Sequence, residues 1–289
     1  MKKLSLFLLL APLVAAARLW AADAPARMVV ALKPDKDPDA MVAERKALAD
    51  DLAAKLGRPV EVIVPLSAAV IVEGLANGTI DLAYLSATDA INARQSGAAD
   101  VLLAGEIDGR TSYPSYWVAL KEKPYQSIAD LKGKPVAFAS KTSTSGYVVP
   151  LWDLHQQGFV SGTGRAEEFF GADNTWYGTG YVSAIERVLN GDAEAAAVSY
   201  YVLDKDKHLT PEQRAKLRMI DQQGPVPTHV IAVRAAVSGT DRAKLREALL
   251  ALDPALRDRV FSSKLVEVDA DAHLGSLGEA IALAKRGSE

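Results

Sequence analysis

Cysteine is absent from the 289-residue chain. Its absence excludes a disulfide framework, a thiol nucleophile and a thiolate metal site. It also excludes the lipid-modified cysteine by which many exported bacterial proteins are tethered. A strong excess of either charge is missing as well, since the formal net charge is −3. A chain without a basic footprint is not expected to bind nucleic acid.

Histidine is scarce, and the sequence motifs of common catalytic and cofactor sites are missing. The four histidines are His155, His208, His229 and His273, and they show no metal-ligand spacing such as H-x-x-x-H. Short Gly-Thr-Gly segments lack the rest of a dinucleotide or P-loop fingerprint. No G-x-S-x-G elbow and no Ser-His-Asp set is present. We therefore expect no metal, no cofactor and no enzymatic activity; a serine-dependent hydrolase or transferase is the weaker alternative.

The N-terminus carries the one long apolar stretch of the chain. Lys2-Lys3 precedes an apolar run from Leu4 to Ala17, and small residues follow it. This is the layout of a secretory signal peptide, and the run is short for a membrane span. We expect residues 1–24 to be removed, with cleavage after Ala17, Ala22 or Ala24, within 17–26. An uncleaved anchor is the alternative. The mature protein should then be free in the periplasm, without a lipid anchor.

Strand-like and helix-like segments alternate after this leader. Apolar segments at 28–32, 60–64 and 80–85 are typical of strands, and helical periodicity lies between them at 41–56 and 70–76. The first helix is expected to end at Gly57 and the second at Asn77-Gly78. A repeated strand–helix unit predicts an α/β fold with a largely parallel sheet.

A second series of the same kind begins near residue 136. Strands are expected at 136–139, 168–170 and 195–198, and a helix at 181–189 that ends at Asn190-Gly191. A possible strand at 217–220 precedes a Gly-Pro-rich turn at 224–227. The two Asn-Gly helix ends are either an internal repeat or a coincidence. Two such lobes would hold a ligand in the cleft between them, at loops beyond the strand ends.

A cluster of hydroxyl side chains joins a strand to a helix in this second series. The run is Lys141-Thr142-Ser143-Thr144-Ser145-Gly146-Tyr147, placed after the apolar residues 135–139. If a helix begins inside it, the first turn adds unpaired N–H groups and a partial positive charge. Together these groups suit a small oxyanion such as a phosphate-like group. An ordinary Ser/Thr helix cap with spare hydroxyls is the alternative.

Four segments in a fixed order give the chain a family likeness. They are Asp81–Leu85, Ser127–Lys134, Thr142–Tyr147 and Asn190–Asp192. Together they resemble the periplasmic phosphate/phosphite/phosphonate-binding proteins of ABC importers, from about Met28 to Val233. The segment Ser127–Lys134 is shared by many bilobed binding proteins. The hydroxyl run that follows it is much more specific.

The resemblance implies a type II periplasmic binding protein, an α/β fold of two lobes joined by two crossovers. Each lobe would be a mixed, mainly parallel sheet flanked by helices. The first lobe would comprise residues 27–116 and 228–289, and the second lobe residues 117–227. The protein would act as a monomer.

The resemblance also implies a binding site. The family's hydroxyl cradle matches Ser143, Thr144 and Ser145, with their adjacent backbone. A tyrosine on the strand that enters the second lobe matches Tyr116. The end of the third strand matches Tyr84 and Ser86.

Three further positions depart from the family pattern. Tyr181 stands where the family usually has histidine, Ser199 where it often has an acid, and Ala68 where it has tyrosine. We count Tyr181 and Ser199 among the ligand-binding residues. Because Ser199 cannot pair with an ammonium group, an aminoalkyl phosphonate is not expected. The nearby aromatics either line a pocket for an apolar substituent or belong to core or interlobe packing; they are Trp176, Tyr177, Tyr181, Tyr200 and Tyr201.

The expected function is capture of a small oxyanion for a membrane ABC permease. Hydrogen bonds to a charged group contribute about 1.5–3 kcal/mol each, so several hydroxyl and N–H donors suffice without an obligatory cation. A periplasmic partner of a sensor kinase, which would bind the same ligand and report it, is the alternative.

Overall fold

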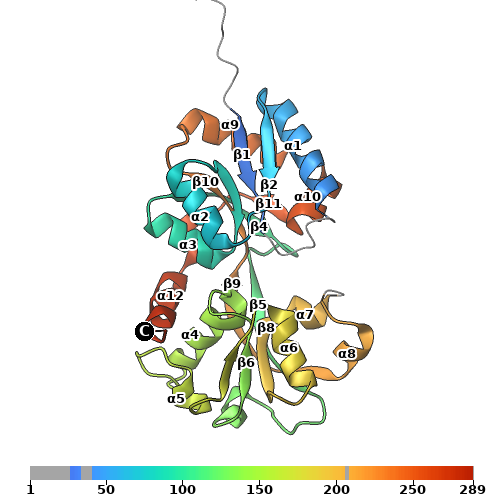
Figure 1. Ribbon diagram of the computed structural model, residues 1–289, viewed down its shortest axis with the longest axis vertical. Helices are drawn as coiled ribbons and strands as arrows, with labels where there is room; N and C mark the ends of the chain where they lie inside the picture. The colour runs from blue at the N-terminus through green and yellow to red at the C-terminus, as the bar shows by residue number, and fades with distance from the viewer. Residues whose placement is uncertain (1–26, 34–40, 206–207, 289) are drawn as a thin grey trace, which may run out of the picture.

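The computed structural model describes residues 27–33, 41–205 and 208–288, which form two lobes joined by a narrow waist (Figure 1). One lobe is built on a six-stranded sheet and the other on a five-stranded sheet. The predicted signal peptide, 1–24, lies outside the described residues. Within these residues, no helix combines the length and the apolar character that crossing a bilayer requires.

The first lobe contains the chain before β5 (Ser112–Leu120) and the C-terminal segment that returns after β9 (Leu217–Pro227). Its sheet has the order β11-β4-β10-β3-β1-β2. The strands are β1 (Met28–Ala31), β2 (Val60–Ile63), β3 (Leu82–Leu85), β4 (Ala99–Glu106), β10 (Val230–Arg234) and β11 (Lys264–Val266). The helices are α1 (Val42–Leu56), α2 (Ala68–Asn77), α3 (Ala87–Gln95), α9 (Gly239–Leu250), α10 (Pro254–Phe261) and α11 (Ala270–Leu274).

Local signals explain the ends of these elements. Helices α1 and α2 end at Gly57 and Gly78, both left-handed, as the sequence predicted.

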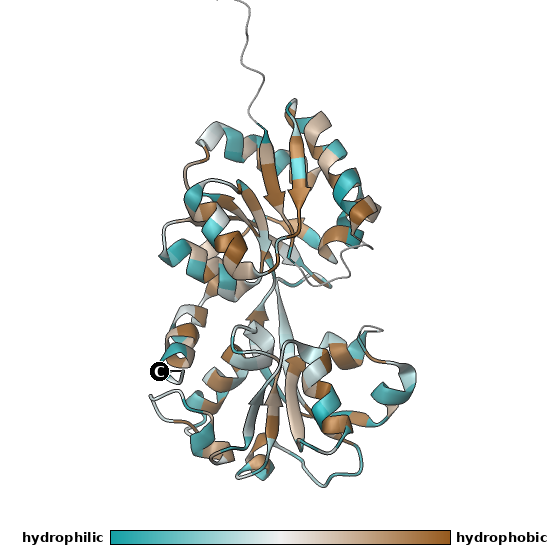
Figure 2. Cartoon of the chain, in the orientation of Figure 1, coloured by the Kyte–Doolittle hydropathy of each residue, from teal (hydrophilic) through white to brown (hydrophobic). Residues whose placement is uncertain are grey.

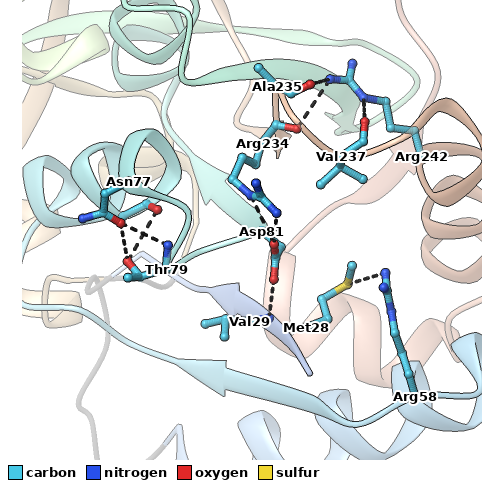
Figure 3. Close-up of polar contacts among 11 residues, drawn as sticks. Met28, Val29, Arg58, Asn77, Thr79, Asp81, Arg234, Ala235, Val237 and Arg242 are labelled. Atoms are coloured by element: carbon cyan, nitrogen blue, oxygen red, sulfur yellow. Dashed lines mark hydrogen bonds and ion pairs between the residues drawn. The ribbon is translucent and has the colours of Figure 1, made fainter. Parts of the chain in front are cut away.

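One carboxylate joins three strands: Asp81 accepts hydrogen bonds from the backbone N–H of Val29 and from the Arg234 guanidinium, at 2.8–3.2 Å (Figure 3). These bonds align β1, β3 and β10 at one end of the sheet. The opposite ends of β1 and β3 then meet at the edge that faces the second lobe.

The second lobe has a sheet of order β7-β6-β8-β5-β9. The strands are β5 (Ser112–Leu120), β6 (Val136–Phe138), β7 (Thr175–Tyr177), β8 (Ala195–Ser199) and β9 (Leu217–Pro227). The helices are the 3-10 helix η1 (Ile128–Leu131), the π-helix η2 (Thr144–Val148), α4 (Val149–Gln156), α5 (Glu167–Phe170), α6 (Tyr181–Leu189), α7 (Tyr201–Asp204) and α8 (Pro211–Ala215).

The final helix, α12 (Leu277–Arg286), lies beside the waist and packs against α3 of the first lobe and α4 of the second (Figure 1). Its buried side chains, such as Leu277 and Leu283, share one apolar core with Ile91 of α3 and with Leu151 and Leu154 of α4. Hydrophobic residues concentrate on the strands, and the helices alternate hydrophobic and hydrophilic faces (Figure 2).

The α/β fold with mixed sheets is confirmed, although antiparallel pairing is more extensive than expected. Parallel pairs join β1 to β2 and β3, and β6 to β7 and β8, whereas β10, β4, β11, β5 and β9 pair antiparallel. Antiparallel pairs form where the chain comes back to a sheet, because the returning strand runs opposite to the strand beside it. Their sequences alternate or run apolar in the same manner as parallel strands, so the pattern does not show direction.

Two local expectations are corrected by the structure. Residues 168–170 belong to the short helix α5 rather than to a strand, and Gly171 ends it with φ 95°. The predicted Gly-Pro-rich turn at 224–227 is the last part of β9, which pairs with β5 through Val226 and Pro227.

Candidate ligand-binding cleft

A cleft of about 1480 Å³ lies between the lobes. Residues of the first lobe on its wall include Lys33, Ala68, Tyr84, Ser86, Asp89 and His229. Residues of the second lobe include Tyr113, Ser140, Thr142, Ser143, Thr144 and Tyr181. Most of these side chains follow the carboxyl ends of strands, which is where open α/β sheets hold ligands.

The hydroxyl run forms the N-terminus of a helix at this cleft. Ser143 is the N-cap, and its hydroxyl accepts a hydrogen bond from the backbone N–H of Gly146 at 3.0 Å. The π-turn Thr144–Val148 continues directly into α4, so the two make one helical segment. Within the described chain, the N–H groups of Thr144 and Ser145 have no acceptor. The run is therefore a helix cap that also presents free donors. The two interpretations of the sequence, a helix cap and an oxyanion-binding site, are compatible.

A second helix N-terminus meets the first one across the interface of the lobes. Ser86 caps α3: its hydroxyl accepts from the backbone N–H of Asp89 and donates to the Asp89 carboxylate at 2.6 Å. The hydroxyls of Thr88, in α3, and Thr144 lie 2.8 Å apart, and both residues are buried. Helix N-termini carry partial positive charge, so two converging ones favour an anion at this place.

The first lobe also brings a cation and a neutral histidine to the cleft. The Lys33 Nζ atom lies 3.4 Å from Nε2 of His229, whose ring packs against Tyr84 at 5.2 Å. Desolvation, with a smaller contribution from the charge of Lys33, lowers the pKa of His229 to about 3. Burial raises the pKa of the Asp89 carboxyl, against the opposing effects of the Ser86 hydroxyl and Lys33. At neutral pH, His229 is thus uncharged and Lys33 supplies the positive charge.

Lys33 was missed in the sequence. A signal was available, because Lys33 closely follows β1, and the carboxyl ends of the parallel strands β1 and β3 meet at one sheet edge. A cation in the cleft strengthens the electrostatic case for an anionic ligand.

Five of the sequence-predicted site residues line the cleft. They are Ser143, Thr144, Tyr84, Ser86 and Tyr181. The hydroxyl of Tyr84 donates to the carbonyl of Phe261 at 2.9 Å, which holds its ring against the cleft wall.

Ser145 lies behind this wall and is fully buried. Its hydroxyl is 2.6 Å from that of Tyr181, and its carbonyl accepts from the Ser115 hydroxyl at 2.5 Å. Its side chain therefore orients Tyr181, while its backbone N–H belongs to the free helix end.

The structure does not bring the other two predicted residues, Tyr116 and Ser199, to the cleft. Tyr116 donates its hydroxyl to the Asp204 carboxylate at 2.7 Å, and Tyr113 lines the cleft instead. The two tyrosines lie on opposite faces of β5, as strand alternation requires: Tyr113 packs in the same core as Trp117, whereas Tyr116 packs in the same core as Val118. Ser199 ends β8, is fully buried, and its hydroxyl has no hydrogen-bond partner among the described residues.

The aromatic residues of the second lobe divide into two groups. Tyr181, Tyr200 and Tyr201 line the cleft. Trp176 packs under the Arg187 guanidinium, and Tyr177 stacks on Phe138 at 5.4 Å, so these two rings serve the lobe itself.

Comparison with known proteins identifies the family. The sequence profile of the family described as ABC transporter, phosphonate, periplasmic substrate-binding protein matches residues 30–272. The chain belongs to this family. Its members are substrate-binding components of transporters and not enzymes, so the likeness and the non-enzymatic role predicted from the sequence are both confirmed.

Curated relatives within this family match part of their length. The phosphate-import protein PhnD of Mycolicibacterium smegmatis is 28% identical over 185 residues, which is 63% of this chain and 57% of the relative. The phosphonates-binding periplasmic protein of Escherichia coli is 27% identical over 202 residues, 68% of this chain and again 57% of the relative.

Solved structures confirm the two-lobe, type II periplasmic binding protein fold. XAC2383 from Xanthomonas citri, bound to chloride, has a TM-score of 0.77 and 22% identity over 90% of this chain and 98% of that one. PhnD1 from Prochlorococcus marinus, in complex with methylphosphonate, has a TM-score of 0.73 and 18% identity over 90% of this chain and 98% of that one.

Proposed function

We propose that this protein captures a small oxyanion, a phosphonate, phosphite or phosphate, between its two lobes and delivers it to an ABC permease. The observation that carries the proposal is the meeting of two helix N-termini at the cleft. One presents the hydroxyls of Ser143 and Thr144 with free N–H groups, and the other is capped by Ser86. Family membership makes the periplasm the expected place of action and a membrane permease the expected partner.

The ligands associated with related proteins support an anionic ligand. The Prochlorococcus protein was solved with methylphosphonate, the Mycolicibacterium relative is named for phosphate import, and XAC2383 was solved both with chloride and with ATP. All of these ligands are anions, and they range in size from chloride to ATP.

The available donors can supply the required affinity. A micromolar ligand needs about 8 kcal/mol, and each hydrogen bond to a charged group contributes about 1.5–3 kcal/mol. The N–H group of Thr144, the hydroxyls of Ser143 and Thr144, and the charge of Lys33 lie on the walls of one cleft. At the upper end of that range, the summed free energy of these interactions exceeds the required value of about 8 kcal/mol, and the surplus offsets the entropy lost on association.

Calorimetry of the purified protein with methylphosphonate, phosphite and phosphate tests the proposal. At least one of these anions should bind, and Ser143→Ala should weaken it roughly tenfold or more, the loss expected for a charged hydrogen bond. Thr240→Ala is the matched control, because Thr240 is an exposed hydroxyl residue at the start of α9, away from the cleft. Binding of none of these anions to the wild-type protein would refute the function.

A further inference from the structure

A continuous series of aromatic rings lines one side of the cleft. The ring of Tyr113 lies 5.7 Å from that of Tyr200, which lies 5.9 Å from Tyr201. Tyr201 in turn contacts Tyr181 at 5.5 Å and His208 at 5.5 Å. All five side chains line the cleft. We call Tyr181, Tyr200, Tyr201 and His208 the aromatic wall, since these rings keep part of their surface exposed.

The aromatic wall adjoins the hydroxyl run through one contact. The hydroxyl of Tyr181 is 2.6 Å from that of Ser145, the residue whose backbone follows Ser143 and Thr144 at the helix N-terminus. An oxyanion held by this N-terminus therefore has the ring of Tyr181 as a neighbour. Whatever group the oxyanion carries can extend from there over Tyr201.

The polar surroundings of the aromatic wall favour an uncharged group. Lys205 also lines the cleft, and its Nζ atom lies 3.9 Å from the Asp108 carboxylate. The nearby carboxylate of Asp204 accepts a hydrogen bond from Tyr116, and β8 ends in the neutral Ser199. A cationic group over the rings would be repelled by Lys205. The two carboxylates that could pair with it, those of Asp108 and Asp204, already have partners. A planar apolar group would pack on the ring faces without such a penalty.

The size of the cleft allows for such a group. Pockets for drug-sized ligands measure roughly 300–1,000 Å³, and this cleft measures about 1480 Å³. Inorganic phosphate or phosphite would leave most of the aromatic wall uncovered.

We propose that the protein selects an organophosphorus ligand with an uncharged aryl substituent, whose oxyanion sits at the Ser143–Ser145 helix end and whose ring packs on Tyr181 and Tyr201. This inference rests on the proposed oxyanion-binding function and names its ligand class. Tyr201 is then a specificity-determining residue for the substituent, and it has no part in holding the oxyanion.

Calorimetry with phenylphosphonate and methylphosphonate tests the inference, because the two probes share the oxyanion and differ in the substituent. Phenylphosphonate should bind the wild-type protein about tenfold more tightly or better. Tyr201→Leu should remove most of this preference and leave methylphosphonate within about twofold of wild type. Tyr201→Phe, which keeps the ring, should retain the preference.

The outcomes separate this inference from the function on which it rests. Equal or tighter binding of methylphosphonate by the wild type overturns the aryl class alone, and so does an equal loss of both ligands in Tyr201→Leu. Failure of both phosphonates, phosphite and phosphate to bind overturns the function and the inference together. Thermal melts of the variants check folding, and a Tyr201→Phe protein that loses the preference would contradict the packing role of the ring.

Discussion

The pair formed by Lys33 and His229 makes the stability of the protein depend on pH. Desolvation and Lys33 lower the pKa of His229 from 6.5 to about 3. Below pH 6.5 the unfolded chain therefore binds a proton that the folded protein does not bind until about pH 3. The stabilisation associated with neutral His229 is complete above pH 6.5 and is lost as pH falls towards 3. The slope is at most about 1.4 kcal/mol per pH unit for this group.

Urea unfolding at several pH values between 7 and 5 measures this slope. The free energy of unfolding should fall with pH in the wild type and should fall less steeply in His229→Gln. Some slope should persist in the variant, since burial also lowers the pKa of His273. Asp89 acts in the opposite direction, because its raised pKa favours the folded state at low pH. A variant with the full wild-type slope would show that His229 is not the titrating group.

At the scale of single residues, the sequence predicted the chemistry of the site better than its exact members. Ser143, Thr144 and Ser86 were accessible because hydroxyl residues at helix starts have a strong local signature. Tyr113 was not, because the family resemblance pointed to Tyr116, which lies on the opposite face of β5. The alternation of a strand tells which residues share a face, and it does not tell which face meets the ligand.

At the scale of elements, the π-turn of the hydroxyl run depends on Gly146. A Cβ atom at this position would lie 2.4 Å from Cβ of Ala139 and 2.8 Å from the Ser143 hydroxyl oxygen. Both neighbours are short side chains that cannot move aside without moving the backbone. Gly146→Ala should therefore displace the Ser143 cap and cost about 1–3 kcal/mol of stability, as overpacked cores do.

The same substitution should weaken oxyanion binding by tenfold or more, because the free N–H groups belong to the displaced turn. Urea unfolding and calorimetry measure the two effects. Gly239→Ala is the control: it lies at the start of α9, nothing surrounds its Cβ position within 4 Å, and it should leave both quantities near wild type. If Gly146→Ala kept wild-type stability and affinity, the turn would not be the anion-binding element.

The elements that sequence reasoning placed wrongly were short or lay at pairing edges. Residues 168–170 contain two neighbouring phenylalanines, a run too short for periodicity to separate strand from helix. Strand β9 continues beyond Gly224 and Pro225 because Val226 and Pro227 pair again with β5, a long-range effect. By contrast, α1, α2 and α6 had both periodicity and a terminal Gly or Asn-Gly, and each was found within two residues of its expected start.

At the scale of the whole molecule, α12 joins the two lobes beside the waist. Its apolar side packs in the core that α3 and α4 share, and its end contacts a loop of the second lobe, where the Arg286 guanidinium donates to the Gly162 carbonyl at 2.8 Å. The family resemblance assigned residues 228–289, and with them this helix, to the first lobe. It could not show that the helix also packs on the second, because packing partners are a property of the folded chain.

This joint gives the last prediction. A Cβ atom at Gly287 would lie 1.9 Å from the carbonyl oxygen of Gly164, a backbone atom. Gly287→Ala should therefore lift the end of α12 from the second lobe and loosen the shared core. A loss of about 1–3 kcal/mol corresponds to a fall in melting temperature of several degrees for a protein of this size.

Differential scanning calorimetry measures the effect and its cooperativity. The wild type should unfold in one transition because α12 couples the lobes, whereas Gly287→Ala should melt earlier and over a broader range. Gly278→Ala is the control within the same helix, since no atom lies within 4 Å of its Cβ position. It should melt at or slightly above the wild-type temperature, because alanine favours the helix over glycine. If both variants melted like the wild type, the contact with Gly164 would contribute nothing to the joint.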